Sequence, residues 1–261
     1  MRRLLACLCC VLPIAAAAPA HAESFYRWRD SEGAVRVTRE QPALGVPYQT
    51  LQLPDPIRWV NAPDMPPAAQ PHAAADTRVL FKAASASVYG IVGRSAASRG
   101  GEGAVHYGSA VAISSRLAIT NCHIIEDAGD DIYVGGAADE APAQARLVAA
   151  DYAADRCVIS VDRMELAPVP GIRPFDTLEV GETVFAIGNP LRLERTLSQG
   201  LLSAKRIRGE RRLIQTTAAI SPGSSGGGLF DSQGNLLGIT SYSLAGAQAI
   251  NFAIPAEDYW K

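Results

Sequence analysis

From residue 77 onward, the chain alternates short apolar runs with breaks that contain glycine, proline, aspartate or asparagine. Many runs lie about ten to fifteen residues apart, which is typical of short strands joined by turns. We therefore expect an all-β domain, either a sandwich or a barrel. The expected strands are 87–92, 109–113, 117–120, 131–134, 145–149, 157–161, 183–187, 197–204, 213–217, 236–242 and 249–254.

Two short helices are expected at the ends of this β region. The first spans residues 77–84, and Asp76 is placed to cap its first turn. The second begins after Pro255 and runs to about residue 260.

A separate small β-hairpin is expected over residues 24–38. Tyr26 and Trp28 alternate with arginines, residues 30–33 are of turn-forming types, and valines alternate in the return strand. A lone hairpin is only marginally stable, so we interpret Tyr26 and Trp28 as the apolar face that it must bury. A ligand platform is the alternative interpretation.

The first 22 residues have the pattern of a secretory signal peptide. Two arginines precede an apolar core of residues 4–18, and Ala20, His21 and Ala22 form a small-x-small cleavage site before Glu23. The apolar run is too short for a stable membrane span. A lipoprotein signal at Cys7 is disfavoured because almost no apolar core precedes that cysteine.

These patterns divide the chain into a signal peptide of residues 1–22, a hairpin domain of residues 23–53, a linker of residues 54–76 and a β domain of residues 77–261. The linker holds six prolines and many alanines, which is typical of an extended, semi-rigid spacer.

The net charge of the chain argues against nucleic acid as a partner. It is −2, so the chain has no strong positive field to attract nucleic acid. Residues 192–212 hold seven basic residues and two acids. We interpret this segment as a solvated face, with a contact surface for an acidic partner as the alternative.

The strongest chemical signal is the glycine-rich stretch of residues 221–228, Ser-Pro-Gly-Ser-Ser-Gly-Gly-Gly. Such a turn can expose a serine hydroxyl while backbone N–H groups converge on one point, which is a nucleophile beside an oxyanion hole. A glycine-rich surface loop is the alternative. Gly223-x-Ser225-x-Gly227 also fits the nucleophile elbow of α/β-hydrolases, but there the histidine follows the serine. All four histidines, His21, His72, His106 and His123, precede Ser225.

Three segments carry a family resemblance: residues 108–123 with Thr-Asn-Cys-His, residues 151–159 and residues 221–228. In this order they resemble a trypsin-like serine protease of the bacterial HtrA/Deg type. The supporting motifs are Ala186-Ile187-Gly188-Asn189-Pro190, Leu197-Ser198-Gln199-Gly200, Gly238-Ile239 and Asn251-Phe252-Ala253-Ile254-Pro255.

The resemblance covers residues 77–255 and implies two six-stranded antiparallel β-barrels, at about 77–168 and 169–255. It implies an exported, periplasmic or secreted serine endopeptidase that acts on protein or peptide substrates, with no cofactor and no metal. No PDZ domain is expected after residue 255. A protease-fold binding or scaffold protein with little turnover is the alternative. The hairpin resembles a short uncharacterised domain of exported bacterial proteins, which implies no activity.

Three residues match the catalytic positions of the family. His123 matches the general base, Asp155 the acid that orients it, and Ser225 the nucleophile. Asp151 competes with Asp155, but the apolar strand follows Asp155 more directly. Ser224 competes with Ser225, but only Ser225 has Gly-x-Ser-Gly-Gly spacing.

The resemblance also implies the surroundings of the nucleophile. The backbone N–H groups of Gly223 and Ser225 match the oxyanion hole. No acid stands at the expected base of the substrate pocket, so cleavage after lysine or arginine is not expected, and small or medium apolar side chains are preferred. The expected pocket residues are Ala219, Ile220, Ser221, Thr240, Ser241 and Tyr242, with Ile250 nearby.

The chain departs from the family at three positions. Gly228 stands where proline or alanine is usual, and Ser221 and Ser224 stand where asparagine is common. We expect these residues to loosen the loop.

A disulfide between Cys122 and Cys157 is expected. They are the only cysteines after residue 22, and an exported protein meets oxidising conditions. Cys122 is next to His123, and Cys157 lies two residues after Asp155, on the same face if the strand includes both. Two buried thiols are the alternative.

Overall fold

The structure, a computed structural model, describes only part of the chain. The described residues are 24–29, 35–38, 41–52, 63–68, 76–94, 104–126, 128–135, 141–189, 195–244, 246 and 248–260. The chain forms two compact units, Met1–Asp55 and Pro56–Lys261. The predicted signal peptide, the predicted hairpin turn at 30–33, His72 and residues 190–194 lie outside the described residues.

The first unit contains a three-stranded antiparallel sheet in the order β2-β1-β3. Its strands are β1 Ser24–Arg29, β2 Val35–Thr38 and β3 Tyr48–Gln52. β1 and β2 pair as the hairpin pattern predicts. β3 was not predicted. It pairs with the other edge of β1 and gives the hairpin the third strand that independent stability usually requires.

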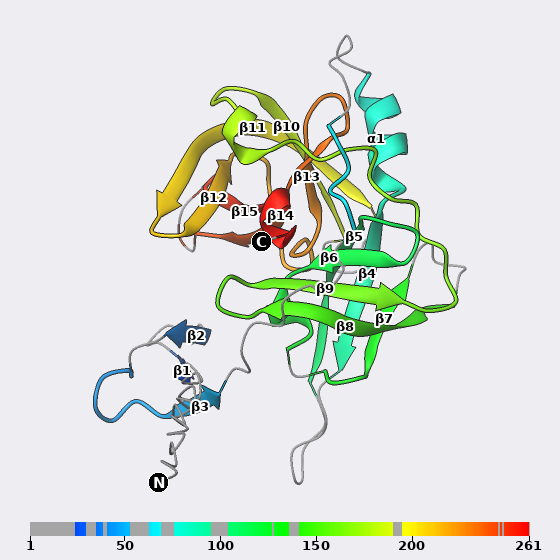
Figure 1. Ribbon diagram of the computed structural model, residues 1–261. Coiled ribbons are helices and arrows are strands. Elements are labelled where there is room, and N and C mark those ends of the chain that lie inside the picture. Colours follow the sequence, from blue (N-terminus) through cyan, green and yellow to red (C-terminus); the bar gives the residue numbers. More distant parts are fainter. Residues whose placement is uncertain are drawn as a thin grey trace, which may run out of the picture. The chain divides into compact units, whose positions relative to one another are not determined.

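The second unit contains two closed six-stranded antiparallel barrels (Figure 1). This confirms the predicted fold class. Barrel 1 has the order β4-β5-β6-β9-β8-β7, and barrel 2 the order β10-β11-β12-β15-β14-β13. The strands are β4 Val88–Arg94, β5 Val105–Ala112, β6 Leu117–Thr120, β7 Ile132–Gly135, β8 Ala143–Asp151, β9 Arg156–Val161, β10 Thr183–Gly188, β11 Thr196–Arg208, β12 Arg211–Thr216, β13 Gly228–Phe230, β14 Leu236–Ser243 and β15 Asn251–Pro255.

The helices of this unit are short. α1, Thr77–Ser85, begins as predicted: the Asp76 carboxylate accepts a hydrogen bond from the Arg78 N–H at 2.8 Å. The 3-10 turns are η1 Cys122–Ile124, η2 Phe175–Thr177 and η4 Ala256–Trp260. Within the described ranges, no helix has the length and apolar character needed to cross a membrane.

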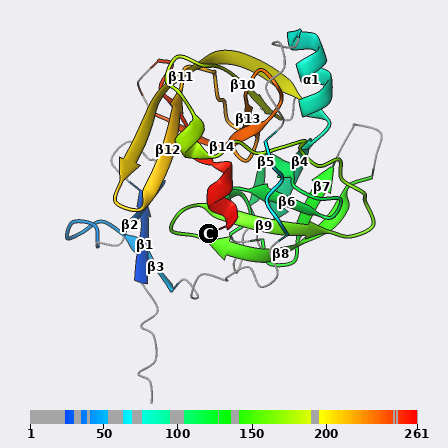
Figure 2. The same cartoon turned by 45° about the horizontal axis from the view of Figure 1, so that its top comes forward.

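Three apolar clusters hold the second unit together. One fills barrel 1 and includes Ile91 and Ile159, and one fills barrel 2 and includes Phe175 and Leu202. The third combines residues of both barrels with Tyr259 of η4. Figures 1 and 2 show η4, in red, between the two barrels. The two barrels are therefore packed together through a shared core.

Part of the predicted linker packs on this unit. Met65 lies against the shared cluster. The Pro66 carbonyl accepts a hydrogen bond from the Ile172 N–H at 3.1 Å, and the Pro63 carbonyl accepts one from the Trp260 indole at 2.8 Å. Residues 63–68 thus belong to the second unit.

Candidate active site

The pairing of two strands in barrel 1 brings His123 close to Asp155. β6 pairs with β9, and Thr120 lies opposite Cys157. His123 follows β6 in the turn η1, and Asp155 directly precedes β9. The ends of two antiparallel strands therefore bring together residues 32 positions apart in the sequence.

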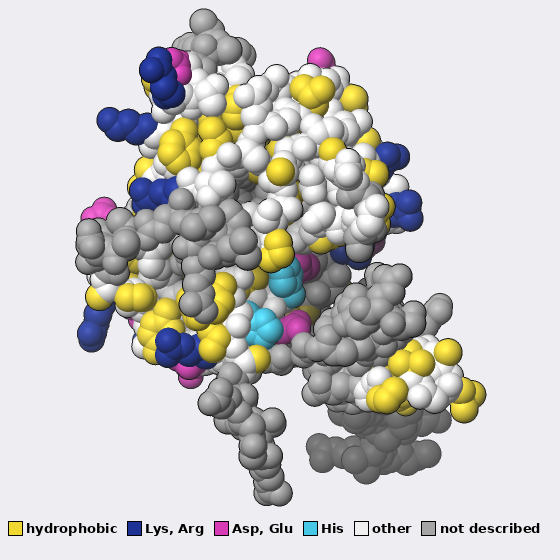
Figure 3. All heavy atoms as spheres, turned by 180° about the vertical axis from the view of Figure 1, so that it is seen from behind, with side chains coloured by type: hydrophobic (Ala, Val, Ile, Leu, Met, Phe, Trp, Pro, Cys, Tyr) yellow, Lys and Arg dark blue, Asp and Glu magenta, His cyan; other side chains and the backbone are white. Residues whose placement is uncertain are grey.

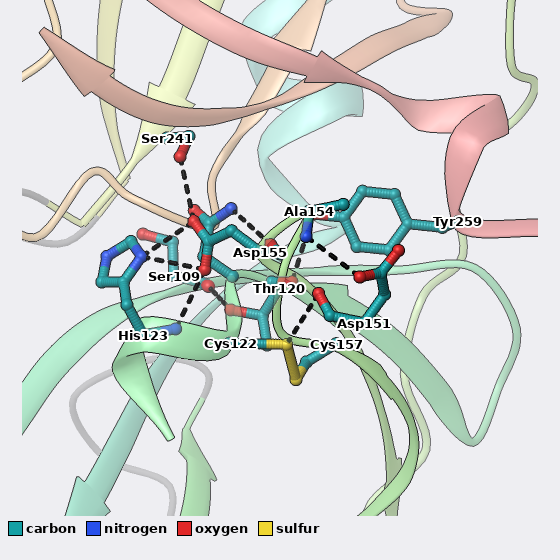
Figure 4. The surroundings of a disulfide bond; sticks show 11 residues. Ser109, Thr120, Cys122, His123, Asp151, Ala154, Asp155, Cys157, Ser241 and Tyr259 are labelled. Atoms are coloured by element: carbon teal, nitrogen blue, oxygen red, sulfur yellow. Dashed lines mark hydrogen bonds and ion pairs between the residues drawn. A yellow bond between two sulfur atoms is a disulfide. The ribbon is translucent and has the colours of Figure 1, made fainter. Parts of the chain in front are cut away.

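The Asp155 carboxylate binds the His123 ring and its backbone (Figure 4). Nδ1 of His123 lies 2.9 Å from Oδ2 and 3.1 Å from Oδ1, and the His123 N–H donates to Oδ1 at 3.0 Å. The Ser241 hydroxyl donates to Oδ2 at 3.1 Å. Three groups thus fix the carboxylate, and Nε2 of His123 is left as the ring nitrogen that can accept a proton.

Asp155 has an unusual backbone conformation with φ of 60°. The buried Asn121 side-chain amide donates to the Asp155 carbonyl at 3.2 Å, which stabilises this left-handed residue. Asp151 has a different role. Its carboxylate accepts from the Ala154 N–H at 3.0 Å and pairs with Arg156 at 2.5 Å. Asp151 closes the turn that presents Asp155 to the histidine.

The environment raises the pKa of His123 above its ordinary value. Burial lowers this pKa, but the hydrogen bond and the charge of Asp155, together with the charge of Glu126, outweigh that effect. Half of the side chain, 48%, is still exposed to solvent. Histidine side chains, in cyan, lie beside acidic side chains on the face of the second unit shown in Figure 3.

Ser225 lies in the glycine-rich loop between the barrels. Its hydroxyl donates to the Ser241 carbonyl at 2.8 Å, and within the described residues no hydrogen bond joins it to His123. Gly226 follows with φ of 83°, and a Cβ atom there would lie 1.8 Å from the Ser109 carbonyl oxygen. This loop therefore requires glycine directly after Ser225.

Residues 221–224 form a tight turn before the serine. The Ser224 N–H donates to the Ser221 carbonyl at 2.9 Å, and Gly223 has φ of 92°. With Pro222 in the second position, these are the features of a type II turn. In the described part of the chain, the N–H groups of Gly223 and Ser225 have no acceptor, so both are available to bind an oxyanion.

Two buried side chains hold the loop from opposite sides. The Thr240 hydroxyl donates to the Ser224 carbonyl at 2.6 Å. The Ser109 hydroxyl, on β5 of barrel 1, donates to the Gly223 carbonyl at 3.0 Å and accepts from the Asn189 N–H at 2.9 Å. The Ser109 N–H also donates to the Ser225 carbonyl at 2.8 Å. Barrel 1 thus positions a loop that belongs to barrel 2.

Ser109 and Asn121 have roles that the sequence pattern did not indicate. Both are fully buried polar residues: Ser109 begins the strand predicted at 109–113, and Asn121 follows the strand predicted at 117–120. A buried polar group needs a hydrogen-bond partner. A polar residue at the end of an apolar strand was therefore the sign in the sequence that such a partner exists. The partners themselves lie far away in the sequence, at residues 223 and 155.

The expected substrate-pocket residues divide into two groups. Thr240 and Ser241 are buried, and their hydroxyls bind the loop and Asp155 respectively. The side chains of these two residues therefore support the glycine-rich loop and the Asp155 carboxylate. Ala219, Ser221 and Tyr242 are exposed, and Ile220 and Ile250 are partly exposed.

The expected disulfide joins Cys122 and Cys157, whose Cα atoms are 5.0 Å apart. Both residues are buried in the core of barrel 1. Asp155 precedes β9 and is not part of it, so strand alternation does not place Cys157 on the same face as Asp155. The antiparallel pairing of β6 with β9 brings the cysteines together, and the bond ties the His123 segment to the Asp155 segment.

The C-terminal turn η4 supports the same segments from behind. The buried Tyr259 hydroxyl donates to the Thr120 carbonyl at 3.1 Å, and the Arg156 guanidinium donates to the Asp258 carbonyl. Burial, the largest effect, raises the pKa of Tyr259 well above its ordinary value, so this hydroxyl stays protonated and remains a donor.

Gly228 has a packing role that the sequence pattern did not indicate. It begins β13, and a Cβ atom there would lie 2.3 Å from the ring of the fully buried Phe230. The ring occupies the space that an alanine or proline side chain would need.

No metal site was expected. In the ranges that the structure describes, no group of three or more His, Cys, Asp or Glu side chains could hold a metal ion.

Comparison with known proteins gives one family. The sequence pattern of the trypsin-like peptidase domain matches residues 108–239. The chloroplastic Protease Do-like 1 of Arabidopsis thaliana is 40% identical over 152 residues, which is 53% of this chain and 34% of that protein. A probable periplasmic serine endoprotease, DegP-like, of Pseudomonas putida is 37% identical over 162 residues, 58% of this chain and 32% of that protein.

A solved structure of an HtrA-type protease with a tripeptide superposes with a TM-score of 0.61 at 30% identity. The match covers 70% of this chain and 60% of the other. The matched region spans about a third of the length of both curated relatives.

Proposed function

This chain belongs to the trypsin-like peptidase family, and from that membership and the geometry around His123 we propose that it is an exported serine endopeptidase. The substrates are proteins or peptides. One observation carries the proposal: the His123 ring is held by Asp155 at 2.9 Å, beside a loop that presents a serine and two unbonded amides.

In the proposed reaction, Ser225 attacks the scissile carbonyl carbon, and Nε2 of His123 takes the hydroxyl proton. The electron pair of the carbonyl moves to its oxygen, which binds the N–H groups of Gly223 and Ser225. His123 then gives the proton to the leaving amine, and the acyl group stays on Ser225. Asp155 keeps the imidazole in the correct tautomer, with Nδ1 protonated. Water completes the cycle by hydrolysing the ester.

The Ser225 hydroxyl must first turn from the Ser241 carbonyl to His123. Hydrogen bonds of this kind are often absent from an unliganded site and form when substrate binds. The same observation supports a second candidate function, a binding or scaffold protein with little turnover, in which Ser225 stays on the Ser241 carbonyl.

Export is part of the proposal. The N-terminal signal pattern, the disulfide and the name of a relative as periplasmic all fit an oxidising compartment outside the cytoplasm.

A fluorophosphonate probe, which reacts with activated serines, tests the proposal. Ser225→Ala should abolish labelling, and the neighbouring Ser224→Ala should retain it. His123→Ala should reduce labelling by at least about a thousandfold. Normal folding of the wild type without any labelling, in the presence or absence of peptide, would favour the scaffold function. Labelling that is lost in Ser224→Ala and kept in Ser225→Ala would refute the assignment of the nucleophile.

A further inference from the structure

The Tyr259 hydroxyl is bonded to the segment that carries His123. It donates to the Thr120 carbonyl at 3.1 Å, and Thr120 is the last residue of β6, three positions before His123. In Figure 4, Tyr259 and His123 lie on opposite sides of Asp155. Tyr259 is only 5% exposed, so its hydroxyl holds the histidine segment from inside the fold.

The neighbouring residue of η4 is bonded to the segment that carries Asp155. The Arg156 guanidinium donates to the Asp258 carbonyl, and Arg156 directly follows Asp155. The Asp258 carboxylate pairs with Arg212 of β12, which ties η4 to barrel 2. The turn η4 is thus a fixed support that contacts both the histidine segment and the aspartate segment.

The two segments need such a support because strand pairing ends before it reaches His123. The pairing of β6 with β9 stops at Thr120, opposite Cys157. Beyond that point, His123 lies in the 3-10 turn η1, and Asp155 has a left-handed backbone with φ of 60°. The 2.9 Å contact between Nδ1 of His123 and Oδ2 of Asp155 therefore depends on the bonds that hold the ends of the two strands. The disulfide is one such bond, and the Tyr259 hydroxyl supplies another.

The hydroxyl of Tyr259 is the part that apolar packing does not explain. The ring packs in the apolar cluster that the two barrels share, and a phenylalanine ring of the same size would fill that space. A buried hydroxyl is costly unless it is hydrogen-bonded, and its partner is the carbonyl at the end of β6. The hydroxyl therefore has a specific function at this strand end.

We propose that Tyr259 is a positioning residue of the candidate active site: its hydroxyl fixes the end of β6 and, through it, the geometry of His123 relative to Asp155. The inference rests on the proposed peptidase function, since it concerns the base of that reaction. A displaced His123 ring holds Nε2 less accurately toward Ser225, and small displacements of a reacting group are costly in rate.

Tyr259→Phe and Tyr89→Phe form a matched pair of variants that tests this inference. Tyr89 is 7% exposed and lies in barrel 1, where its hydroxyl accepts a hydrogen bond from the Ala167 N–H at 2.8 Å. Each variant keeps the ring and removes a hydroxyl that is bonded to one backbone group, so both should fold and should lower the melting temperature by similar amounts. We expect Tyr259→Phe to slow fluorophosphonate labelling of Ser225 by about tenfold and Tyr89→Phe to keep the wild-type rate.

The pKa of His123 gives a second readout, which does not require turnover. Burial lowers this pKa, but the hydrogen bond and the charge of Asp155, together with the charge of Glu126, outweigh that effect. A weaker contact with Asp155 should therefore lower the pKa. We expect an NMR titration of the His123 ring, whose signal is identified by its absence in His123→Ala, to show a lower pKa in Tyr259→Phe than in the wild type and an unchanged pKa in Tyr89→Phe.

Two results would overturn the inference. Equal labelling rates in the two variants would show that the Tyr259 hydroxyl acts on stability alone. An unchanged His123 pKa in Tyr259→Phe, even with slower labelling, would show that the effect does not pass through the contact with Asp155. Failure of the proposed function is distinguishable, since the wild type would then not be labelled, and the titration would still decide whether Tyr259 acts on His123.

Discussion

Ser109 is the residue that connects barrel 1 to the turn carrying the unbonded amides. Its hydroxyl bonds to two residues: it donates to the Gly223 carbonyl, and it accepts from the backbone N–H and the side-chain amide of Asn189. Both residues lie in barrel 2, and Ser109 is fully buried. Removal of the hydroxyl would leave these polar groups without this partner and would free the turn to change its conformation.

We predict that Ser109→Ala lowers the rate of fluorophosphonate labelling by about tenfold to a hundredfold, because small displacements of oxyanion donors are costly. Thr120→Val is the matched control. It removes a buried hydroxyl that donates to the Ser109 carbonyl at 2.7 Å but has no bond to the turn. Both variants should lose about 1–3 kcal/mol of stability. Equal labelling rates in the two variants would contradict a positioning role for Ser109.

The raised pKa of His123 predicts the pH dependence of the reaction. A general base must be neutral, so activity is lost as pH falls and the ring becomes protonated. We expect the labelling rate to rise with pH through a midpoint above about 6.5, the ordinary histidine value. Glu126→Gln removes one of the charges that raise this pKa and should move the midpoint to lower pH. A wild-type midpoint below the ordinary value would show that Asp155 does not act on His123 in this way.

At the scale of elements, the glycine-rich stretch combines two different requirements. Gly223 and Gly226 have positive φ angles, which favour glycine in the turn. Gly228 belongs to β13 and is needed because the Phe230 ring covers it. A strand that begins within a glycine run has few side chains to show it, which is why the sequence pattern missed β13.

We predict that Gly228→Ala lowers the free energy of unfolding by about 1–3 kcal/mol through overpacking against Phe230. The double variant Gly228→Ala, Phe230→Leu should lose less stability than the sum of the two single variants. Gly135→Ala is the control, because a Cβ atom there meets nothing within 4 Å. Urea unfolding of the two single variants, the double variant and the control gives the four free energies of unfolding to compare with the wild type. Full additivity of the two substitutions would refute a direct conflict between them.

At the scale of the whole molecule, two segments that are far apart in the sequence meet in the second unit. Residues 63–68 contact the turn η4 through the hydrogen bond from the Trp260 indole to the Pro63 carbonyl. η4 also supports the segments that carry His123 and Asp155, through Tyr259 and Arg156. The boundary between the two compact units lies at residues 55 and 56, before the described part of the linker.

We predict that a protein beginning at residue 56 after its start codon labels with the fluorophosphonate as the longer chain does. A protein beginning at residue 71 should lose about 2–4 kcal/mol of stability, since the packing of Met65 and two hydrogen bonds are removed. Met65→Ala in the longer chain tests the same contact without truncation. Equal melting temperatures for the two truncated proteins would show that residues 63–68 do not stabilise the unit.

The strand pattern and the candidate chemistry could be predicted without the structure. Short apolar runs separated by turn-forming residues predicted eleven of the twelve barrel strands, because a strand buries apolar side chains in the core. The position of every histidine before Ser225 excluded the α/β-hydrolase arrangement. The three candidate positions at His123, Asp155 and Ser225 were inferred from motifs that resemble those of the HtrA/Deg type.

Which distant groups meet could be seen only in the three-dimensional structure. The choice of Asp155 as the partner of His123 depends on a left-handed backbone held by Asn121 and on Asp151 being bound to Arg156. The role of Ser109 depends on contact between two barrels. The physical reason is that hydrogen bonds and charge pairs depend on spatial neighbours, whereas apolar periodicity depends only on neighbours along the chain.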